Sequence, residues 1–378
     1  MKAQAAVLRA ASTPLELLEI DVESPRPREV VVRLVSAGIC HTDLGVIAAA
    51  TDEQLPIVLG HEGAGIIEKV GTGVTELSVG DHVVLSYNHC GSCDNCRSGL
   101  PMHCRDFIPL NLVGARLDGT SPFSLEGKRI LGHFFGQSSW ATRIIATELN
   151  CVKVDDDLPL ALLGPLGCGI QTGAGAVLNT LKPTAGSSIA IFGMGSVGLS
   201  ALLGAVVSNC ETIIAVDIDD ARLARATELG ATATVNAAAT AAADQIRRLT
   251  AGRGVQFTVD CIGFGDVIRT ALESLQTPGV CATVGYQGVP NEITIDHGHL
   301  LFGKSLIGVI EGDAIPQQFI PRLLDLFRAG RFPFDRLVDN FPFESINDAI
   351  EALHAGKAIK AVLTYPSADR DAIKSSNG

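Results

Sequence analysis

The stretch Ile189-Ala-Ile-Phe-Gly193-Met-Gly195-Ser-Val-Gly198 decides how the second half of this chain folds. Its apolar start, rich in Ile and Phe, is typical of a buried parallel strand. Three glycines follow, and then an apolar segment of helical length. A strand, a glycine turn and a helix together form the context of a dinucleotide-binding motif. In such a motif the first glycine makes the turn, the second lets the backbone approach a pyrophosphate, and the third packs the helix on the strand.

A second predicted strand, Thr212–Asp217, strengthens this interpretation, because a glycine triplet alone often marks only a turn. Asp217 ends the strand and lies about 20 residues after Gly198, which is the spacing of the acid that hydrogen-bonds the adenosine ribose. A carboxylate there suits the 2′-hydroxyl of NAD and repels the 2′-phosphate of NADP. Arg222 lies close enough in the sequence to weaken that repulsion. We therefore predict that the chain binds NAD.

The segment after Asp217 is predicted to complete an α/β sheet. Further alternations of strand and helix bring the total to six parallel strands, which make a complete doubly wound sheet. These strands are expected near residues 233–235, 255–260, 279–284 and 305–310, with helices over 221–229 and 244–249. We predict that residues 170–310 form this dinucleotide-binding domain.

The composition is that of an acidic globular protein. The chain has 378 residues, 47% of them hydrophobic, which is enough for two or three domains and a sizeable core. Its net charge of −12 argues against nucleic acid or an anionic membrane as a partner. No apolar run approaches the ~20 residues that span a bilayer, and the start of the chain lacks the apolar core of a signal peptide. We expect a cytoplasmic protein whose ten cysteines are thiols or metal ligands.

The N-terminal part of the chain alternates short apolar runs with Gly and Pro, a pattern typical of a small β-barrel-like domain. The clearest strands there cover residues 29–35, 65–70 and 81–85. Near the C-terminus, segments without a place in the six-stranded sheet are a helix over 315–328, a helix over 345–354 and a strand over 361–365. We expect these segments to return to the first domain. Residues 1–169 and 311–378 are therefore predicted to form one catalytic domain.

Four cysteines follow one another as Cys90-x₂-Cys93-x₂-Cys96-x₇-Cys104. Glycine and small polar residues separate them, so the loop is able to wrap one ion. A Cys₄ set is typical of a closed, structural zinc site. Iron–sulfur clusters use similar spacings, and free thiols are a further alternative. We favour zinc because a second zinc-type set accompanies the loop and no other redox motif does.

That second set consists of Cys40, His61 and Cys168. Taken singly, each of these residues is more often a packed core side chain than a ligand. Together they make the Cys₂His pattern of a catalytic zinc whose fourth position is open to substrate. Phe134 and Phe135, in an aromatic stretch between His61 and Cys168, either fill the core or line a pocket.

These motifs resemble those of the zinc-dependent alcohol dehydrogenases, a family of the medium-chain dehydrogenase/reductase superfamily. The matching stretches are Cys40-His-Thr-Asp43, Gly60-His-Glu-Gly63, the four-cysteine loop, Cys168 and the glycine turn, in this order and with matching gaps over nearly the whole chain. Residues 133–139 and 164–176 look most similar to bacterial aryl-alcohol (benzyl alcohol) dehydrogenases, and terpene-alcohol enzymes such as geraniol dehydrogenases look similar too. The resemblance implies an α/β protein with a GroES-like β-barrel-type catalytic domain and a Rossmann domain with a doubly wound, six-stranded parallel sheet.

The resemblance also implies a role for each matching residue. Asp43 would hydrogen-bond His61 and fix its tautomer, Glu62 would lie behind the metal, and Thr42 would hydrogen-bond the substrate oxygen. The implied catalytic residues are Cys40, Thr42, Asp43, His61, Glu62 and Cys168, and the structural zinc ligands are Cys90, Cys93, Cys96 and Cys104. The implied cofactor contacts are His41, Gly193, Gly195, Ser196, Val197, Gly198, Asp217, Arg222 and Lys360, with His41 and Lys360 near the pyrophosphate. Two zinc ions per chain and NAD are the expected cofactors.

The implied reaction is the reversible oxidation of a benzylic primary alcohol to its aldehyde, by hydride transfer from a zinc-bound alkoxide to NAD. The expected partners are the small alcohol or aldehyde and further copies of the chain, in a homodimer or homotetramer. The alternatives are a terpene or allylic alcohol dehydrogenase, a zinc-free NADPH reductase of the same superfamily, and a nucleotide-binding scaffold without turnover.

Two positions depart from patterns found in this family. Gly45 stands where many alcohol dehydrogenases carry a histidine that continues the proton relay, so the proton must leave Thr42 by another route. Ser86 stands where some relatives carry a bulky aromatic side chain. We expect the small side chain to leave room for a ring-sized substrate.

Overall fold

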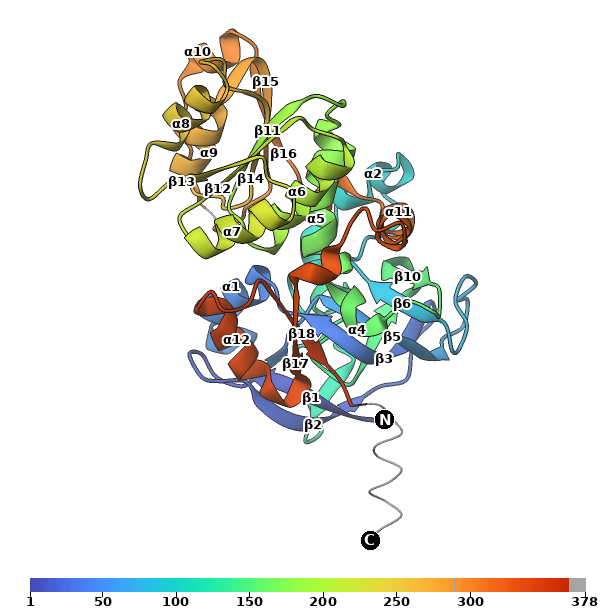
Figure 1. Cartoon of the computed structure of the whole chain (residues 1–378). Helices are drawn as coiled ribbons and strands as arrows, with labels where there is room; N and C mark the ends of the chain where they lie inside the picture. The colour runs from blue at the N-terminus through green and yellow to red at the C-terminus, as the bar shows by residue number, and fades with distance from the viewer. Residues whose placement is uncertain (289, 367–378) are drawn as a thin grey trace. The chain divides into compact units, whose positions relative to one another are not determined.

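The computed structural model describes residues 1–288 and 290–366, which form two compact units (Figure 1). The first unit contains Met1–Cys168, Ile315–Pro321 and the described residues from Val338 onward, and the second contains the described residues of Gly169–Ala314 together with Arg322–Leu337. Compared with the expected domain ranges, residues 322–337 belong to the second unit rather than the first. The predicted boundaries at 169/170 and 310/311 stay a prediction.

The second unit is built on a parallel sheet of six strands in the order β13-β12-β11-β14-β15-β16. The strands are β11 (Ser188–Phe192), β12 (Thr212–Asp217), β13 (Ala233–Asn236), β14 (Val255–Asp260), β15 (Leu275–Thr283) and β16 (Lys304–Gly308). The central strand β11 is buried on both faces, which explains its continuous apolar sequence. The six-stranded parallel sheet predicted from the sequence is therefore confirmed.

Helices cover both faces of this sheet, with α6 on one side and α8 and α9 on the other (Figure 1). The helices of the second unit are α5 (Gly169–Gly175), which continues as a π-helix over Ala176–Leu181, α6 (Ser196–Val207), α7 (Asp220–Glu228), α8 (Ala242–Leu249), α9 (Gly265–Glu273) and α10 (His297–Leu301). Helix α6 is buried along most of its length, because it lies in the core of the unit.

The first unit contains two β-sheets. A five-stranded sheet has the order β4-β1-β2-β7-β8, and a seven-stranded sheet has the order β10-β6-β5-β3-β18-β17 with β9 also paired to β3. The strands are β1 (Lys2–Leu8), β2 (Glu16–Val22), β3 (Glu29–Gly38), β4 (Ile57–Val58), β5 (Glu62–Val70), β6 (His82–Leu85), β7 (Phe123–Leu125), β8 (Lys128–Arg129), β9 (Arg143–Thr147), β10 (Cys151–Val154), β17 (Val338–Pro342) and β18 (Lys360–Thr364). One apolar core includes Trp140, Phe123 and Phe343.

The last strand of the chain pairs with a strand from its N-terminal part. Strand β18 pairs antiparallel with β3, with Val362 opposite Gly38, so the C-terminal segment returns to the first unit. The helices of the unit are α1 (His41–Ala49), α2 (Asp94–Arg97), α3 (Phe107–Asn111), α4 (Leu160–Leu163) and α12 (Ile346–His354), whereas the residues of α11 (Pro316–Arg328) are divided between the two units. Strand β18 thereby brings Lys360 next to the segment that carries Cys40.

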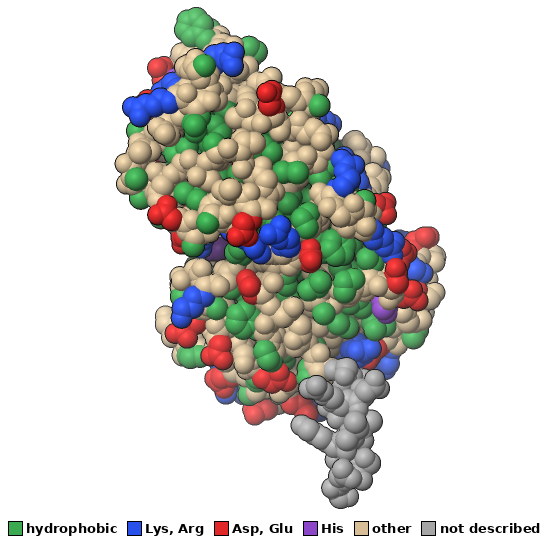
Figure 2. Space-filling model, viewed as in Figure 1, with side chains coloured by type: hydrophobic (Ala, Val, Ile, Leu, Met, Phe, Trp, Pro, Cys, Tyr) green, Lys and Arg blue, Asp and Glu red, His purple; other side chains and the backbone are tan. Residues whose placement is uncertain are grey.

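Two further observations concern the surface and the helices. Figure 2 shows acidic and basic side chains interspersed on the face that it draws. Over residues 1–288 and 290–366, no single helix is long and apolar enough to cross a membrane. One bent pair, Leu160–Gly167 with Gly169–Leu181, passes that test jointly, by length and composition only.

Candidate active site and metal centres

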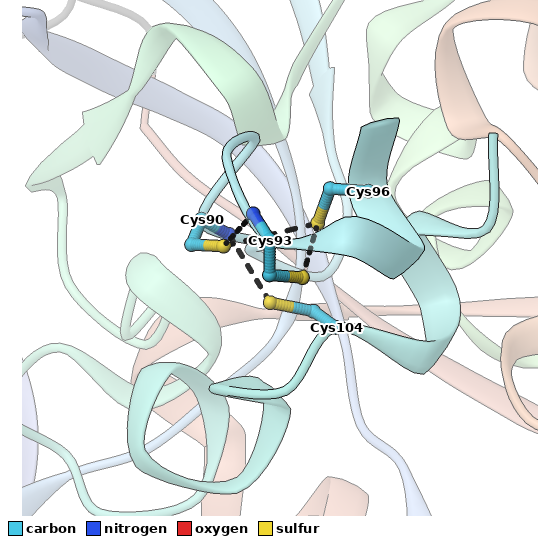
Figure 3. Close-up of side chains that lie close together, drawn as sticks. All are labelled: Cys90, Cys93, Cys96 and Cys104. Atoms are coloured by element: carbon cyan, nitrogen blue, oxygen red, sulfur yellow. Dashed lines mark hydrogen bonds between the residues drawn. The ribbon is translucent and has the colours of Figure 1, made fainter. Parts of the chain in front are cut away.

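The four-cysteine loop brings its thiols to one point. The Sγ atoms of Cys90, Cys93, Cys96 and Cys104 all lie within 4.8 Å of one another, and Figure 3 shows the four side chains turned toward a common centre. The backbone N–H of Cys93 donates to Cys90 Sγ at 3.3 Å, and that of Cys90 donates to Cys104 Sγ at 3.3 Å. N–H donors of this kind, from Arg105 and Cys96, lower the pKa of Cys93 to about 6. A closed set of four sulfur donors fits a structural zinc ion.

A second group of ligand atoms lies in the interior of the first unit. Cys40 precedes α1, His61 precedes β5, Glu62 is the first residue of β5, and Cys168 directly precedes α5. One ligand atom from each of the four lies within 4.8 Å of the others. The structure thus brings together the three predicted ligands, although His61 and Cys168 lie far apart along the chain.

His61 is oriented for a metal ion. Its Nδ1 lies 2.9 Å from Asp43 Oδ1, and both side chains are fully buried. Asp43 also accepts hydrogen bonds from the backbone N–H groups of Gly60 at 3.0 Å and Cys40 at 3.1 Å. With Nδ1 occupied by Asp43, the second ring nitrogen Nε2 is buried without a hydrogen-bond partner in the described chain. A buried, unpartnered nitrogen beside two thiols and a carboxylate fits a zinc ligand.

The electrostatics of this group favour a divalent cation. Burial lowers the pKa of His61, but the charges of Asp43 and Cys40 outweigh it and raise the pKa well above its usual value. A hydrogen bond from Cys168, together with His61 and Lys360, holds the pKa of Cys40 well below its usual value. The thiolate is the form of cysteine that binds a metal ion, so the lowered pKa favours ligation by Cys40.

Glu62 and Lys360 form a buried ion pair behind these ligands. Lys360 Nζ lies 2.8 and 2.9 Å from the two carboxylate oxygens of Glu62 and donates to the carbonyl of Ile39 at 3.1 Å. Burial lowers the pKa of Lys360, but Glu62 outweighs it and raises the pKa above its usual value. A Cβ atom at Gly38 would lie 1.9 Å from Glu62 Oε2, so the pair requires glycine there.

This ion pair bears on the role expected of Lys360. All three ammonium protons have protein acceptors in the structure, whereas a phosphate contact was expected. A phosphate would have to replace one of these acceptors. The predicted pyrophosphate contact of Lys360 therefore stays a prediction, and the observed partner is Glu62.

Two predicted residues begin helix α1. Thr42 Oγ1 lies 3.8 Å from Cys40 Sγ, next to the ligand group. His41 is the first residue of the helix and is exposed. Gly45 lies in the same helix, and a Cβ atom there would meet nothing within 4 Å. The helix thus places a hydroxyl beside the predicted metal ligands, and its contact with a substrate stays a prediction.

The glycine motif has the geometry that its sequence predicts. Gly193 has φ +91°, a left-handed conformation that favours glycine. A Cβ atom at Gly198 would lie 1.7 Å from the carbonyl oxygen of Gly193, so close packing of α6 against the turn requires glycine. A Cβ atom at Gly195 would meet nothing within 4 Å, which leaves room for a ligand above the turn. Ser196 and Val197 open α6, whose N-terminus can receive a pyrophosphate.

Asp217 ends β12 beside this turn. Its Oδ2 accepts a hydrogen bond from the N–H of Met194 at 2.6 Å, and its Oδ1 accepts from Ile218 and Asp219 at 2.7 and 3.0 Å. These bonds fix the carboxylate at the end of the strand, where a ribose acceptor is needed. Arg222 lies in the first turn of the following helix α7.

An aromatic group surrounds His61. Phe135 stacks on the His61 ring, with centroids 4.4 Å apart and planes at 24°, and Phe134 meets the ring edge-on at 5.7 Å. Phe107 packs on Phe135, and Tyr87 packs on Phe107. The sequence left Phe134 and Phe135 undecided between core and pocket. Their adjacency in the pair Phe-Phe was the available signal, but the fold was needed to show that both rings contact His61, a predicted metal ligand.

Comparison with known proteins identifies the family. Residues 26–156 match the model "Alcohol dehydrogenase GroES-like domain", and residues 196–329 match the model "Zinc-binding dehydrogenase". A geraniol dehydrogenase of Castellaniella defragrans is 46% identical over 370 residues, which covers 97% of this chain and 98% of the relative. This chain belongs to the zinc-dependent alcohol dehydrogenase family.

Solved structures of two other proteins are similar to this alcohol dehydrogenase. An alcohol dehydrogenase zinc-binding domain protein from Burkholderia ambifaria has a TM-score of 0.94 and 45% identity, and covers 97% of this chain and 100% of its own. Benzyl alcohol dehydrogenase from Acinetobacter calcoaceticus has a TM-score of 0.93 and 42% identity, with the same coverage. The predicted GroES-like and Rossmann fold is thereby confirmed, and so are zinc and NAD as cofactors.

Proposed function

We propose that this alcohol dehydrogenase oxidises primary alcohols whose carbinol carbon is attached to an aromatic ring, and that it reduces the corresponding aldehydes. The observation that carries the proposal is the aromatic group at His61, in which Phe135 lies flat on the ring and Phe134 lies edge-on. Both rings are buried in this structure, and because aromatic rings prefer stacked or edge-on neighbours, a benzylic ring packed against this group would find suitable partners. Ser86 is buried and small, and its Oγ donates to the carbonyl of Gly167 at 2.7 Å.

The site residues enter as part of this proposal. Cys40, His61 and Cys168 would hold a catalytic zinc ion, with Glu62 behind them, and Cys90, Cys93, Cys96 and Cys104 would hold a structural one. When bound, the catalytic zinc supplies a Lewis acid that polarises the alcohol oxygen.

The chain's own residues would do the remaining work. Asp43 accepts the Nδ1 proton of His61, which keeps the Nε2 lone pair free for the metal. Thr42 Oγ1, beside Cys40, would accept the proton of the substrate hydroxyl. Because Gly45 offers no side chain to continue a relay, that proton would leave through water or the cofactor ribose. Asp217 would accept from the adenosine ribose of NAD, with the turn around Gly195 under the pyrophosphate.

An allylic terpene alcohol is the second candidate substrate. The geraniol dehydrogenase relative, 46% identical over 97% of this chain, favours it. Allylic and benzylic alcohols share a carbinol carbon whose product carbonyl is conjugated, so both would use the same aromatic surface. A zinc-free NADPH reductase is less well supported, because the predicted ligand set is intact and assembled.

Steady-state turnover with benzyl alcohol, geraniol and ethanol, each with NAD and with NADP, tests these proposals. We expect kcat/KM to be highest for benzyl alcohol with NAD, and we expect activity to disappear when a chelator removes the catalytic metal. A preference for geraniol would favour the allylic alcohol as substrate and leave the assignment of the site residues unchanged. Equal efficiency with NADP would contradict the role of Asp217, and turnover indifferent to metal removal would contradict the ligand assignment.

We further propose that the protein is a cytoplasmic homodimer or homotetramer. Six of its ten cysteines lie in the two ligand groups, four in one and two in the other, and cysteines kept as metal ligands rather than disulfides are typical of a reducing compartment. Edge strand β16 and the residues around it expose apolar side chains, including Leu301 at 68%, Phe302 at 72% and Ile307 at 38%. Exposed apolar patches of this kind mark association sites. Sedimentation velocity on the wild type and on Phe302→Glu tests this proposal, and a monomeric wild type would contradict it.

A further inference from the structure

Gln137 lies in an unusual turn beside the proposed catalytic zinc ligands. The turn contains three residues with left-handed backbone: Phe135 at φ +51°, Gly136 at +66° and Ser138 at +54°. Two of these are not glycine, and such a conformation costs roughly 1–2 kcal/mol for each non-glycine residue. Strain of this kind persists only where the surroundings fix it, and it clusters at functional sites.

Hydrogen bonds from neighbouring segments hold the turn in place. Ser138 Oγ accepts from the N–H of Phe134 at 2.9 Å and donates to the carbonyl of Val58 at 2.7 Å. Asn150 Nδ2 lies 3.2 Å from the carbonyl oxygens of both Phe135 and Gly136. The turn is therefore rigid enough to aim the side chain of Gln137.

The side chain of Gln137 is fully buried, and both its amide oxygen and its amide nitrogen make hydrogen bonds. Oε1 accepts a hydrogen bond from the backbone N–H of Gly63 at 3.1 Å. Nε2 donates to the carbonyl of His61 at 2.9 Å and to the carbonyl of Ser86 at 3.3 Å. One side chain thus contacts the backbone on both sides of Glu62 and at a second segment.

This amide bridges two strands where their own pairing stops. Strands β5 and β6 pair from Ile66 opposite His82 to Ala64 opposite Val84. The pairing of the two strands ends at Ala64, and beyond that point Gln137 makes hydrogen bonds to both segments. The glutamine amide therefore takes the place of missing backbone hydrogen bonds.

The bridge connects two of the proposed zinc ligands. On one side it holds the carbonyl of His61 itself. On the other side it holds Ser86, whose Oγ donates to the carbonyl of Gly167, the residue directly before Cys168. Asp43 and Phe135 orient the ring of His61, and Gln137 ties its backbone to the segment that supports Cys168.

We propose that Gln137 is a positioning residue that sets the separation of His61 and Cys168 and so governs how firmly the catalytic zinc is held. The proposal rests on the ligand assignment made under Proposed function. It concerns this chain's own backbone, and it requires no contact between Gln137 and the metal or the substrate. Residues that support metal ligands in this indirect way typically change metal affinity 10- to 100-fold when they are replaced.

The test uses two pairs of matched variants in the full-length, metal-loaded protein. Gln137→Met removes all three hydrogen bonds, and Gln137→Glu keeps the acceptor for Gly63 while losing the donor to His61 and Ser86. Gln256→Met and Gln256→Glu make the same changes at another strand-bridging glutamine, whose Oε1 accepts from the N–H of Ser188 at 2.9 Å, in the second unit and outside the ligand groups. If Gln137→Met does not fold, Gln137→Glu carries the test.

Two readouts without substrate separate positioning from general destabilisation. The first is the rate of zinc release to a chromogenic chelator, which should rise about 10-fold or more for one of the two zinc ions in the Gln137 variants. The other zinc, from the four-cysteine loop, serves as an internal control and should leave at the wild-type rate. The second is the thiolate-to-metal absorption of protein loaded with Co²⁺ at the catalytic site, which should shift in the Gln137 variants and stay unchanged in the Gln256 variants.

The outcomes distinguish this inference from the proposed function. Zinc release that is no faster in the Gln137 variants than in the Gln256 variants, with an unchanged cobalt spectrum, would overturn the positioning role and leave the ligand assignment standing. A wild type that binds only one zinc, or whose cobalt form shows no thiolate absorption at the second site, would instead overturn the ligand assignment.

Discussion

Four of the proposed metal ligands come from the single loop 90–104, whereas Cys40, His61 and Cys168 come from three separate segments. In the loop, neighbouring backbone N–H groups approach the sulfur atoms, and three of the four cysteines are only partly buried. The second group lies in the interior, with Asp43, Glu62 and Lys360 around it. A local group of ligands needs only its own loop, but a dispersed group needs the whole unit to be folded. We therefore expect replacements around the two groups to have different consequences.

The largest effect should come from removing a ligand of the dispersed group. Cys40→Ser replaces a thiolate by a neutral hydroxyl, so we expect kcat/KM to fall at least about a thousandfold, or about 4 kcal/mol. The folded protein should then retain one zinc per chain, measured by atomic emission. Full activity with two zinc ions bound would contradict the assignment of Cys40.

Cys93→Ser is the counterpart in the loop. We expect it to lose the other zinc and to lower the melting temperature, while kcat of the protein that stays folded remains within about twofold of the wild type, because a closed site takes no part in the reaction. A large loss of kcat at unchanged stability would show that the two groups are not separate in function.

The second prediction concerns the ion pair behind the dispersed ligands. Lys360→Met leaves the Glu62 carboxylate buried without its partner, so we expect the free energy of unfolding to fall by about 3–5 kcal/mol. The double variant with Glu62→Gln should recover most of this loss, since it removes the unpaired charge. Urea unfolding monitored by circular dichroism measures both.

Lys304→Met is a matched comparison for that experiment. Lys304 is also buried, but its Nζ donates to the carbonyl groups of Leu272 and Glu273 rather than to a carboxylate. We expect a smaller loss of stability, because no buried charge remains behind. Equal losses in the two variants would mean that the unpaired charge of Glu62 adds nothing to the destabilisation caused by Lys360→Met.

The third prediction concerns the orientation of His61. Asp43→Asn replaces the acceptor at Nδ1 by an amide whose donor end can reverse the tautomer of the ring. Affinity for the catalytic zinc should fall about 10- to 100-fold in a competition titration against a chelator. Unchanged affinity would show that packing by Phe135 alone orients the ring.

The smallest effect is a pH dependence at His133, which is not a ligand of either group. Burial, with the charge of Arg116, lowers the pKa of His133 to about 4, against about 6.5 in the unfolded chain. Between pH 6.5 and pH 4, His133 binds a proton in the unfolded chain but not in the folded chain. The free energy of unfolding therefore decreases as the pH falls through this range. We expect His133 to lower the free energy of unfolding by about 2 kcal/mol between pH 7 and pH 5.

His133→Gln should remove that contribution. The variant and the wild type are compared by urea unfolding at pH 7 and pH 5 with excess zinc, so that loss of metal affects both alike. We expect the difference in unfolding free energy between the two pH values to be smaller in the variant. Identical differences would show that His133 is protonated in the folded chain at pH 5.

The same contrast explains what the sequence could predict. The loop cysteines and the motif around Gly195 are local patterns, so their spacing predicted both structures. Asp43 beside His61 was reached through the family resemblance, and the structure shows the contact at 2.9 Å. Lys360 was expected at a phosphate, but strand β18 pairs with β3 and brings it to Glu62. Gln137 carried no signal at all, because its partners are backbone groups of segments that are distant in sequence.

Gly38 has a consequence for anyone who wishes to reshape this protein by directed evolution. It ends the long strand β3, and nothing in its surrounding sequence sets it apart as a special position. Yet the carboxylate of Glu62 occupies the place where any side chain would begin. A randomised library at this codon should return glycine alone unless position 62 is randomised with it. The two positions are therefore coupled in one order: a smaller side chain has to be selected at position 62 before any side chain can be selected at position 38.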